Sequence, residues 1–261
     1  MWSLCANWRG GRGRNPDAKL SAVIEYAGAT DRGCVRRANQ DIYALEGELG
    51  LFVVADGMGG ARAGERASRI AVETIVASIR EAAPQRSMEC LIEAIRAANR
   101  GILRLAELHP ELQGMGTTVV AALVDSAAVH VASVGDSRAY RWRGTALERV
   151  TSDQTWVNEV GRGLGLTEEQ IKTHPFRHVL TMAVGVRKVV IVRSHEVELG
   201  SGEELLLCSD GLHGVVREEA LASALAENGA LAEKPGRLIQ LARSYGGPDN
   251  ITAVVIRNTG G

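Results

Sequence analysis

Aspartate beside glycine recurs at the ends of the apolar segments of this chain, and this feature most constrains how the chain can fold. Short runs rich in Val, Ile and Leu that stop at glycine are typical of buried β-strands. Three such runs lead into Asp56-Gly57, Gly135-Asp136 and Asp210-Gly211, and a fourth aspartate, Asp249, comes just before another run. In an antiparallel sheet the end of one strand lies beside the start of its neighbour. We therefore expect all four carboxylates at one rim of the sheets.

Four carboxylates at one rim predict a metal site more strongly than a single Asp-Gly pair does, because that pair alone is a favoured hairpin turn. Like charges packed together raise one another's pKa and repel unless a cation offsets them. The neighbouring glycines allow the backbone to come close to an ion and expose a carbonyl to it. Oxygen ligands without a cluster of His or Cys favour Mg²⁺ or Mn²⁺ over Zn²⁺. The pattern predicts a divalent-metal hydrolase without naming its substrate.

The apolar segments together predict an α+β fold in which strands mostly follow strands. Strands are expected at 23–27, 51–55, 117–124, 128–134, 138–142, 189–197, 204–208 and 252–256. The spacing of apolar residues predicts helices at 67–79, 91–108, 217–226 and 237–244. Consecutive strands favour antiparallel sheets, and the helices are expected to cover the outer faces of those sheets.

Composition indicates a soluble, cytoplasmic protein with no nucleic-acid or membrane partner. The 30 basic and 31 acidic residues nearly cancel, whereas nucleic-acid-binding domains usually carry a clustered basic excess. The four cysteines form no CxxC pair, which favours reduced thiols. The nearly uncharged stretch 114–135 contains Asp125 and His130, so two buried strands fit it better than a membrane-spanning helix. Residues 1–20 lack the apolar run of a signal peptide and are expected to form a disordered basic arm.

Five short motifs follow one another along the chain. They are Thr30-Asp31-Arg32-Gly33-Cys34-Val35-Arg36 with Asn39-Gln40-Asp41; Val54-Ala55-Asp56-Gly57-Met58-Gly59-Gly60; Gly114-Met115-Gly116-Thr117-Thr118; Gly135-Asp136-Ser137-Arg138; and Ser209-Asp210-Gly211 with Gly247-Pro248-Asp249-Asn250-Ile251-Thr252. In these residues the sequence resembles the bacterial form of the type 2C metal-dependent protein phosphatases (the PPM family), over about residues 23–257. A single motif of this kind would be weak evidence, whereas five in the family's order are a strong signal.

The resemblance implies a four-layer α-β-β-α sandwich, in which helices flank two mainly antiparallel sheets. One phosphatase domain is expected over residues 21–258, after the basic arm at 1–20. Residues 151–185 resemble the family's flap, an insertion beside the active site. Because surface loops often carry binding functions, substrate selection is expected there.

The resemblance also implies the metal ligands. Asp56 would bridge two ions, Mn²⁺ or Mg²⁺, and the Gly57 carbonyl would ligate one of them. Asp210 and Asp249 would complete the shell of the other ion. Asp136 would hold a third, weaker ion together with Asp210, as in bacterial members of the family.

The catalytic roles implied by the resemblance fall on Asp56 and on two further residues. Arg36 would bind the substrate phosphate, since its planar guanidinium can donate two hydrogen bonds to two oxygens. Asp41 would hold metal-bound water. A water molecule that bridges the two ions would attack phosphorus as the nucleophile.

The function implied is hydrolysis of phosphoserine and phosphothreonine in proteins, opposing a bacterial Ser/Thr kinase. The expected partners are that cognate kinase and its phosphorylated targets, and the expected state is a monomer. The acid that protonates the leaving group stays open, because Met58 stands where human-type members carry a histidine; His174 and His178 in the flap are candidates. Two alternative functions stay open: a catalytically silent phosphoprotein-binding regulator of the same fold, and a metal-dependent hydrolase of small phosphorylated metabolites.

Overall fold

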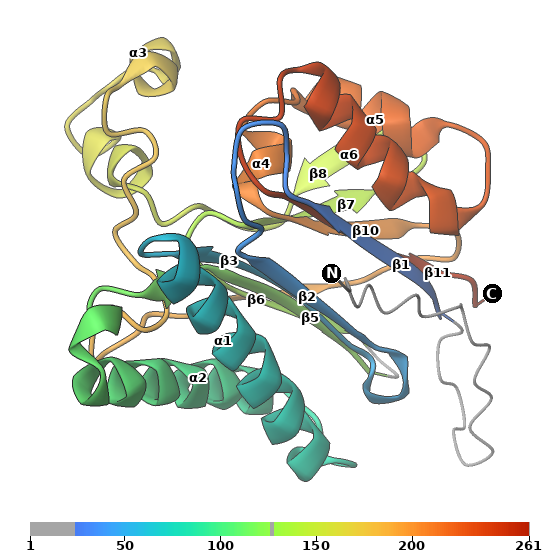
Figure 1. Ribbon diagram of the computed structural model, residues 1–261. Helices are drawn as coiled ribbons and strands as arrows, with labels where there is room; N and C mark the ends of the chain where they lie inside the picture. The colour runs from blue at the N-terminus through green and yellow to red at the C-terminus, as the bar shows by residue number, and fades with distance from the viewer. Residues whose placement is uncertain (1–23, 126–127, 261) are drawn as a thin grey trace.

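A computed structural model describes residues 24–125 and 128–260, and two stacked β-sheets form its centre (Figure 1). The strands are β1 (Ile24–Asp31), β2 (Asp41–Glu46), β3 (Leu51–Met58), β4 (Gly116–Thr117), β5 (Val119–Val124), β6 (Val129–Val134), β7 (Arg138–Trp142), β8 (Leu147–Arg149), β9 (Arg193–Val197), β10 (Glu204–Cys208) and β11 (Ile251–Asn258). One sheet has the order β1-β11-β10-β7-β8 and the other β2-β3-β5-β6-β9, with β4 paired to β3. These strand pairs are antiparallel. The arm predicted at 1–20 lies outside the described residues.

Alternate residues of the central strands enter two different cores, which explains why these strands are apolar on both faces. In β3, Phe52 and Val54 join the core between the sheets, together with Leu207 and Val254 of the opposite sheet. Val53 joins a second core under the helices. Successive side chains of a strand point to opposite faces, so burial of both faces requires apolar residues at every position.

Helices cover the outer face of each sheet, so the molecule has four layers (Figure 1). Helices α1 (Ala61–Ala82) and α2 (Met88–Leu108) pack on the sheet that contains β3, whereas α5 (Glu218–Ala226) and α6 (Lys234–Ser244) pack on the other sheet. These four correspond to the four predicted helices, and the predicted α-β-β-α sandwich is confirmed. The shorter elements are η1 (Gly47–Leu49), η2 (Pro110–Leu112), η3 (Val157–Gly161), α3 (Glu168–Thr173), α4 (Asp210–His213) and η4 (Leu231–Glu233).

The strand prediction is wrong for residues 189–192. The strand begins only at Arg193, because Val189 and Ile191 lie on the surface, 74% and 58% exposed, although their apolar character resembles that of a strand. β3 also continues through Asp56 and Gly57 instead of ending before them. β2 and β8 lie outside the predicted strands, because their short sequences mix charged and apolar residues and carry little period-two signal.

The segment between β8 and β9, residues 150–192, stands away from the sheets and carries η3 and α3 (Figure 1). It is called the projecting segment below. Trp156 stacks on His174 with ring centroids 4.9 Å apart, and Phe176 meets Trp156 edge-on at 5.4 Å. The limits of the predicted flap, 151–185, and of the domain, 21–258, stay predictions. Among the helices of the described residues, none combines the length and the apolar character needed to cross a membrane.

Candidate active site

Strand register brings three predicted aspartates to one rim. Cys208 of β10 pairs with Arg138 of β7. Asp210, which follows β10, and Asp136, which precedes β7, therefore lie at the same end of these strands. β10 also pairs antiparallel with β11, so its end lies beside the start of β11, just after Asp249.

The second sheet adds two further carboxyls, because β2 and β3 place Asp41 directly opposite Asp56. The charges of Asp41 and Asp210 act on the Asp56 carboxyl more strongly than any other charges do. The charges of Asp136 and Asp249 also act on Asp56. These five residues, from both sheets, are called the carboxylate cluster below. The predicted gathering of aspartates at one rim is confirmed, and Asp41 belongs to the same group.

Burial and mutual repulsion oppose simultaneous ionisation of these carboxyls. Burial is the largest cause, and it raises the pKa of Asp41 to about 6 and that of Asp136 to about 8. The charge of Asp210 adds to both shifts. The pKa of Asp56 is raised well above its ordinary value, first by burial and then by the four other carboxylates. The cluster concentrates negative potential that a bound cation would relieve.

The donor set fits a hard divalent cation. Asp41 Oδ1 and Asp210 Oδ1 are buried and have no hydrogen-bond partner within the described part of the chain. A buried carboxylate oxygen without a partner costs free energy, and a cation, or water held by a cation, would supply the missing contact. Among residues 24–125 and 128–260 no three His, Cys, Asp or Glu side chains stand close enough to hold one ion as they are, so a site with three carboxylate ligands would need these side chains to move closer together. This arrangement is compatible with Mg²⁺, which is usually held by one or two carboxylates and keeps several waters.

Two hydroxyl groups orient Asp41, and neither role was predicted from the sequence. Ser209 Oγ and Thr252 Oγ1 each donate a hydrogen bond to Asp41 Oδ2, at 2.7 Å. Both residues are fully buried. Ser209 stands next to Asp210 and Thr252 belongs to the last motif, and these positions were the only sequence signal for their role. That signal is weak, because Ser and Thr at strand ends often hydrogen-bond the nearby backbone instead.

The Thr117-Thr118 pair holds the backbone of Asp56. Thr117 Oγ1 and the Thr118 N–H both donate to the Asp56 carbonyl at 2.8 Å. The Asp56 N–H in turn donates to Thr118 Oγ1 at 3.1 Å. The predicted start of a strand at Thr117 agrees with the burial of both threonines, and their hydrogen bonds also position Asp56.

Arg36 lies at the edge of the carboxylate cluster, in ion-pair contact with Asp249. Its Nη2 is 2.7 Å from Asp249 Oδ2, and its side chain is 52% exposed. Asn250 ties down the loop that carries Arg36: its Nδ2 donates to two backbone carbonyls of segment 32–38, and its Oδ1 accepts from the Gln40 N–H at 2.8 Å. The position of Arg36 thus depends on the residue next to Asp249.

Gly57 has no room for a side chain. Its N–H donates to the Gln40 carbonyl at 3.2 Å. A Cβ at Gly57 would stand 2.1 Å from the Gly64 carbonyl oxygen, which is far inside van der Waals contact. Glycine therefore allows the first turn of α1 to pack directly against the strand end that carries Asp56.

Two residues at the start of the projecting segment clamp the turn that carries Asp136. Asp153 accepts hydrogen bonds from Arg138 Nε at 3.0 Å and Nη2 at 2.7 Å. Burial would raise the pKa of Asp153, but these hydrogen bonds and the charge of Arg138 outweigh burial and lower it. Gln154, which is 2% exposed, accepts from the Gly135 N–H at 2.8 Å and donates its own N–H to the Gly135 carbonyl at 2.9 Å.

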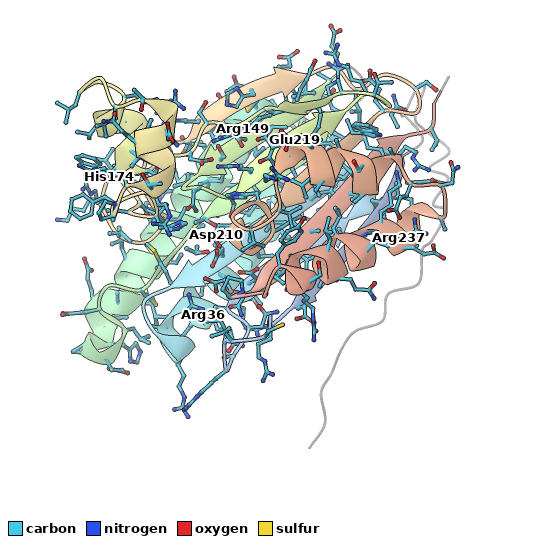
Figure 2. All side chains as sticks on the ribbon, turned by 90° about the horizontal axis from the view of Figure 1, so that it is seen from above. Arg36, Arg149, His174, Asp210, Glu219 and Arg237 are labelled. Carbon is cyan, nitrogen blue, oxygen red and sulfur yellow. The ribbon has the colours of Figure 1, made fainter. Side chains whose placement is uncertain are left out.

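Figure 2 shows Asp210 between Arg36 and Arg149, with His174 in the projecting segment to one side. His174 takes part in the aromatic contacts described above. Burial raises the pKa of Asp210, and the charge of His178 opposes that rise. His178 is therefore within electrostatic reach of the carboxylate cluster.

Comparison with known proteins places the chain among characterised enzymes. The family described as protein phosphatase 2C matches residues 35–244. The serine/threonine phosphatase stp of Listeria monocytogenes is 37% identical over 234 residues, which cover 87% of this chain and 93% of that protein. The serine/threonine protein phosphatase PstP of Mycobacterium tuberculosis is 37% identical over 240 residues, which cover 91% of this chain and 46% of that protein. The crystal structure of the PstP catalytic domain in complex with 2 manganese ions superposes with a TM-score of 0.79 at 34% identity, covering 90% of this chain and 97% of that one.

Proposed function

The chain belongs to the protein phosphatase 2C family, and from that premise we propose that the carboxylate cluster and Arg36 form a two-metal site for phosphoprotein hydrolysis. The chain is a bacterial serine/threonine protein phosphatase of this family, whose members depend on metal ions. The alternatives of a silent regulator and a metabolite hydrolase are set aside, because relatives that match most of the chain are serine/threonine phosphatases. The observation that carries the proposal is the placement of Asp41 directly opposite Asp56, within electrostatic reach of Asp136, Asp210 and Asp249.

The proposed ligand assignment follows the arrangement of the cluster. Asp56, at its centre, would hold two ions, with the Gly57 carbonyl on one of them. Asp210 and Asp249 would hold the second ion, and Asp136 would share a third, weaker ion with Asp210. The same oxygen ligands accept Mn²⁺ or Mg²⁺, so either ion fits.

The side chains around the ions have separate tasks. When bound, the ions would supply an activated nucleophile and offset charge on the phosphate oxygens. Asp41 uses Oδ2 for Ser209 and Thr252, which leaves Oδ1 to accept a hydrogen bond from the attacking water and orient it. Arg36 is half-exposed, so its guanidinium can bind phosphate oxygens with two N–H groups.

Phosphate release from a phosphothreonine peptide tests this proposal, with Mn²⁺, with Mg²⁺ and with chelator. We expect metal-dependent release that the Asp210→Asn variant loses. Glu218→Gln, an exposed change at the start of α5, is the control and should keep full activity. Folded protein that releases no phosphate with either metal, or an Asp210→Asn variant as active as the control, would refute the two-metal site.

Phosphoserine and phosphothreonine arise by kinase action, so we also propose that this phosphatase opposes a cognate Ser/Thr kinase and acts on that kinase's targets. The cytoplasmic location, the monomeric state and the absence of nucleic-acid or membrane partners stay predictions.

A further inference from the structure

The sandwich is open along one side, between the edge strands of its two sheets. β8 ends one sheet and β9 ends the other. Two cavities of about 430 and 520 Å³ lie along this side, and Arg149 and Val150 line both of them. The two cavities therefore adjoin and form one groove, called the β8–β9 groove below.

The half of the groove nearest the projecting segment has a basic excess. It is lined by Arg149, Arg162 and Arg193 and by two carboxylates, Asp153 and Glu159. Asp153 is paired with both Arg149 and Arg138, and Glu159 is paired with Arg193, so four arginines, Arg162 included, stand against two carboxylates. Arg193 keeps one buried nitrogen, Nε, without a hydrogen-bond partner within the described part of the chain. An anionic group would find an excess of positive charge here.

The far half of the groove is acidic. Glu148, Glu196 and Glu198 line it, against Arg141 and the shared Arg149. Arg141 is held by Glu203 at 2.5 Å, which matches its charge. Glu196 and Glu198 are exposed and form no ion pair with any residue of 24–125 or 128–260. The groove is therefore basic near the carboxylate cluster and acidic away from it.

The basic half lies beside the active site, because Asp153 connects the two. The charge of Asp153 acts on Asp136 of the carboxylate cluster. Asp153 also binds Arg138, which follows Asp136 by two residues in the chain. Figure 2 places Arg149 and Arg36 on opposite sides of Asp210. A peptide whose phosphorylated residue reaches the cluster can thus continue into the groove on the side away from Arg36.

We propose that the β8–β9 groove binds an extended segment of the phosphoprotein substrate, with an acidic side chain in the near half and a basic side chain in the far half. The proposal rests on the protein-phosphatase function of the same chain. Edge strands present unpaired backbone groups to which an extended segment can hydrogen-bond. The five residues of β9 span about 16 Å, room for roughly five residues of extended peptide. Charge complementarity sets the order of side chains along it.

Two series of phosphothreonine peptides test the groove. In one series, a short spacer separates the phosphothreonine from two Asp, which are followed by two Lys. In the other series the two Lys come before the two Asp. Each arrangement is placed once on the N-terminal side of the phosphothreonine and once on its C-terminal side. On one flank we expect the Asp-first peptide to have a kcat/KM about fivefold higher, from exposed charge contacts. The preference should lie in KM and should shrink as salt screens the charges.

Charge reversal in the protein makes the test specific. The double variant Arg162→Glu with Glu196→Arg should prefer the Lys-first peptide, while hydrolysis of p-nitrophenyl phosphate, which is too small to reach the groove, stays unchanged. The control is the double variant Arg217→Glu with Glu73→Arg, which reverses exposed charges just before α5 and on α1 and should keep the preference for the Asp-first peptide.

Binding of fluorescein-labelled peptides, followed by anisotropy in chelator, separates the two proposals. A preserved order preference in binding, without hydrolysis in any metal, would count against the metal site and for the groove. Equal binding and equal KM for both orders on both flanks would overturn the groove. A control variant that shifts the preference as much as the groove variant would overturn it as well, because the effect would then be long-range.

Discussion

Two buried groups of charged residues show how differently one fold can treat its carboxylates. Glu204, 2% exposed, accepts from Lys234 Nζ at 2.8 and 3.0 Å and from Arg257 Nη2 at 2.6 Å. In the carboxylate cluster, the charges that act most strongly on Asp56 are those of Asp41 and Asp210 instead. Glu204 is thus neutralised by the chain itself, whereas the cluster gathers like charges.

The comparison separates a structural ion group from a functional one. Burial of a charge is tolerated when cations and hydrogen bonds compensate it, and the Glu204 group meets that condition. The cluster has raised pKa values and two unpartnered oxygens among the described residues. Strongly perturbed carboxyls of this kind indicate a functional site, and here they agree with the metal dependence of the family.

The substitution Asp56→Asn in the carboxylate cluster should have the largest effect, and that effect should fall on activity and not on stability. We expect a loss of at least about a hundredfold in kcat, because the variant loses electrostatic stabilisation of the transition state. The melting temperature in chelator should stay equal or rise, since one repelling carboxylate is removed. Phosphate release and thermal unfolding measure the two effects. A marked fall in melting temperature would show that the cluster stabilises the fold.

Removal of one partner from the group formed by Glu204, Lys234 and Arg257 should have the opposite effect, a loss of stability without a loss of activity. Lys234→Ala leaves Glu204 buried with less compensation, so we expect the unfolding free energy to fall by about 3–5 kcal/mol. The kcat of the folded variant should stay unchanged. Urea denaturation measures the first quantity, with Lys188→Ala, at an exposed lysine, as the control. An unchanged unfolding free energy would contradict the structural role of Lys234.

Addition of Mn²⁺ should stabilise the native protein, because the ions bind the folded cluster and not the unfolded chain. At a free concentration of a hundred times Kd, we expect a gain of about 2.7 kcal/mol in unfolding free energy. Asp56→Asn should lose most of this gain, and Lys234→Ala should keep it. Stabilisation of equal size in both variants would place the ions outside the cluster.

The smallest effect is expected at the base of the projecting segment. Gln154, near the start of that segment, also binds residues closer to its end. Its side-chain Nε2 donates to the Ile191 carbonyl at 2.9 Å, and its backbone carbonyl accepts from the Thr181 N–H at 2.9 Å. Gln154→Met leaves the buried Gly135 N–H without an acceptor, so the unfolding free energy should fall by about 1–3 kcal/mol.

A second readout distinguishes positioning from general stability. Because Gly135 precedes Asp136, Gln154→Met should weaken binding of the weakest Mn²⁺ ion, measured by titration calorimetry. Gln170→Ala, which removes a capping side chain within α3, is the matched control in the same segment and should leave Mn²⁺ binding unchanged. Equal Mn²⁺ affinities in both variants would remove Gln154 from the metal site.

Much of the fold and the carboxylate rim could be predicted from local patterns. The strands that were predicted well, such as β6 and β10, are short, mainly apolar runs that lead into Gly or Asp. The exposed residues Val189 and Ile191 show the limit of that rule, because apolar character indicates burial but does not secure it. Likewise, Thr117 and Thr118 were assigned to a strand, but their hydrogen bonds to Asp56 could not be inferred.

The sequence by itself determined the class of fold, the family and the set of aspartates that meet at the rim, because apolar runs, short motifs and the Asp-Gly pairs at the ends of those runs are local properties of the chain. Only the tertiary structure decided which groups orient them. Thr252 reaches Asp41 across 211 residues of chain, and Asn250 reaches segment 32–38 across a similar distance. The β8–β9 groove likewise exists only where the edges of two sheets meet. Such contacts depend on strand register and sheet stacking, which no local pattern encodes.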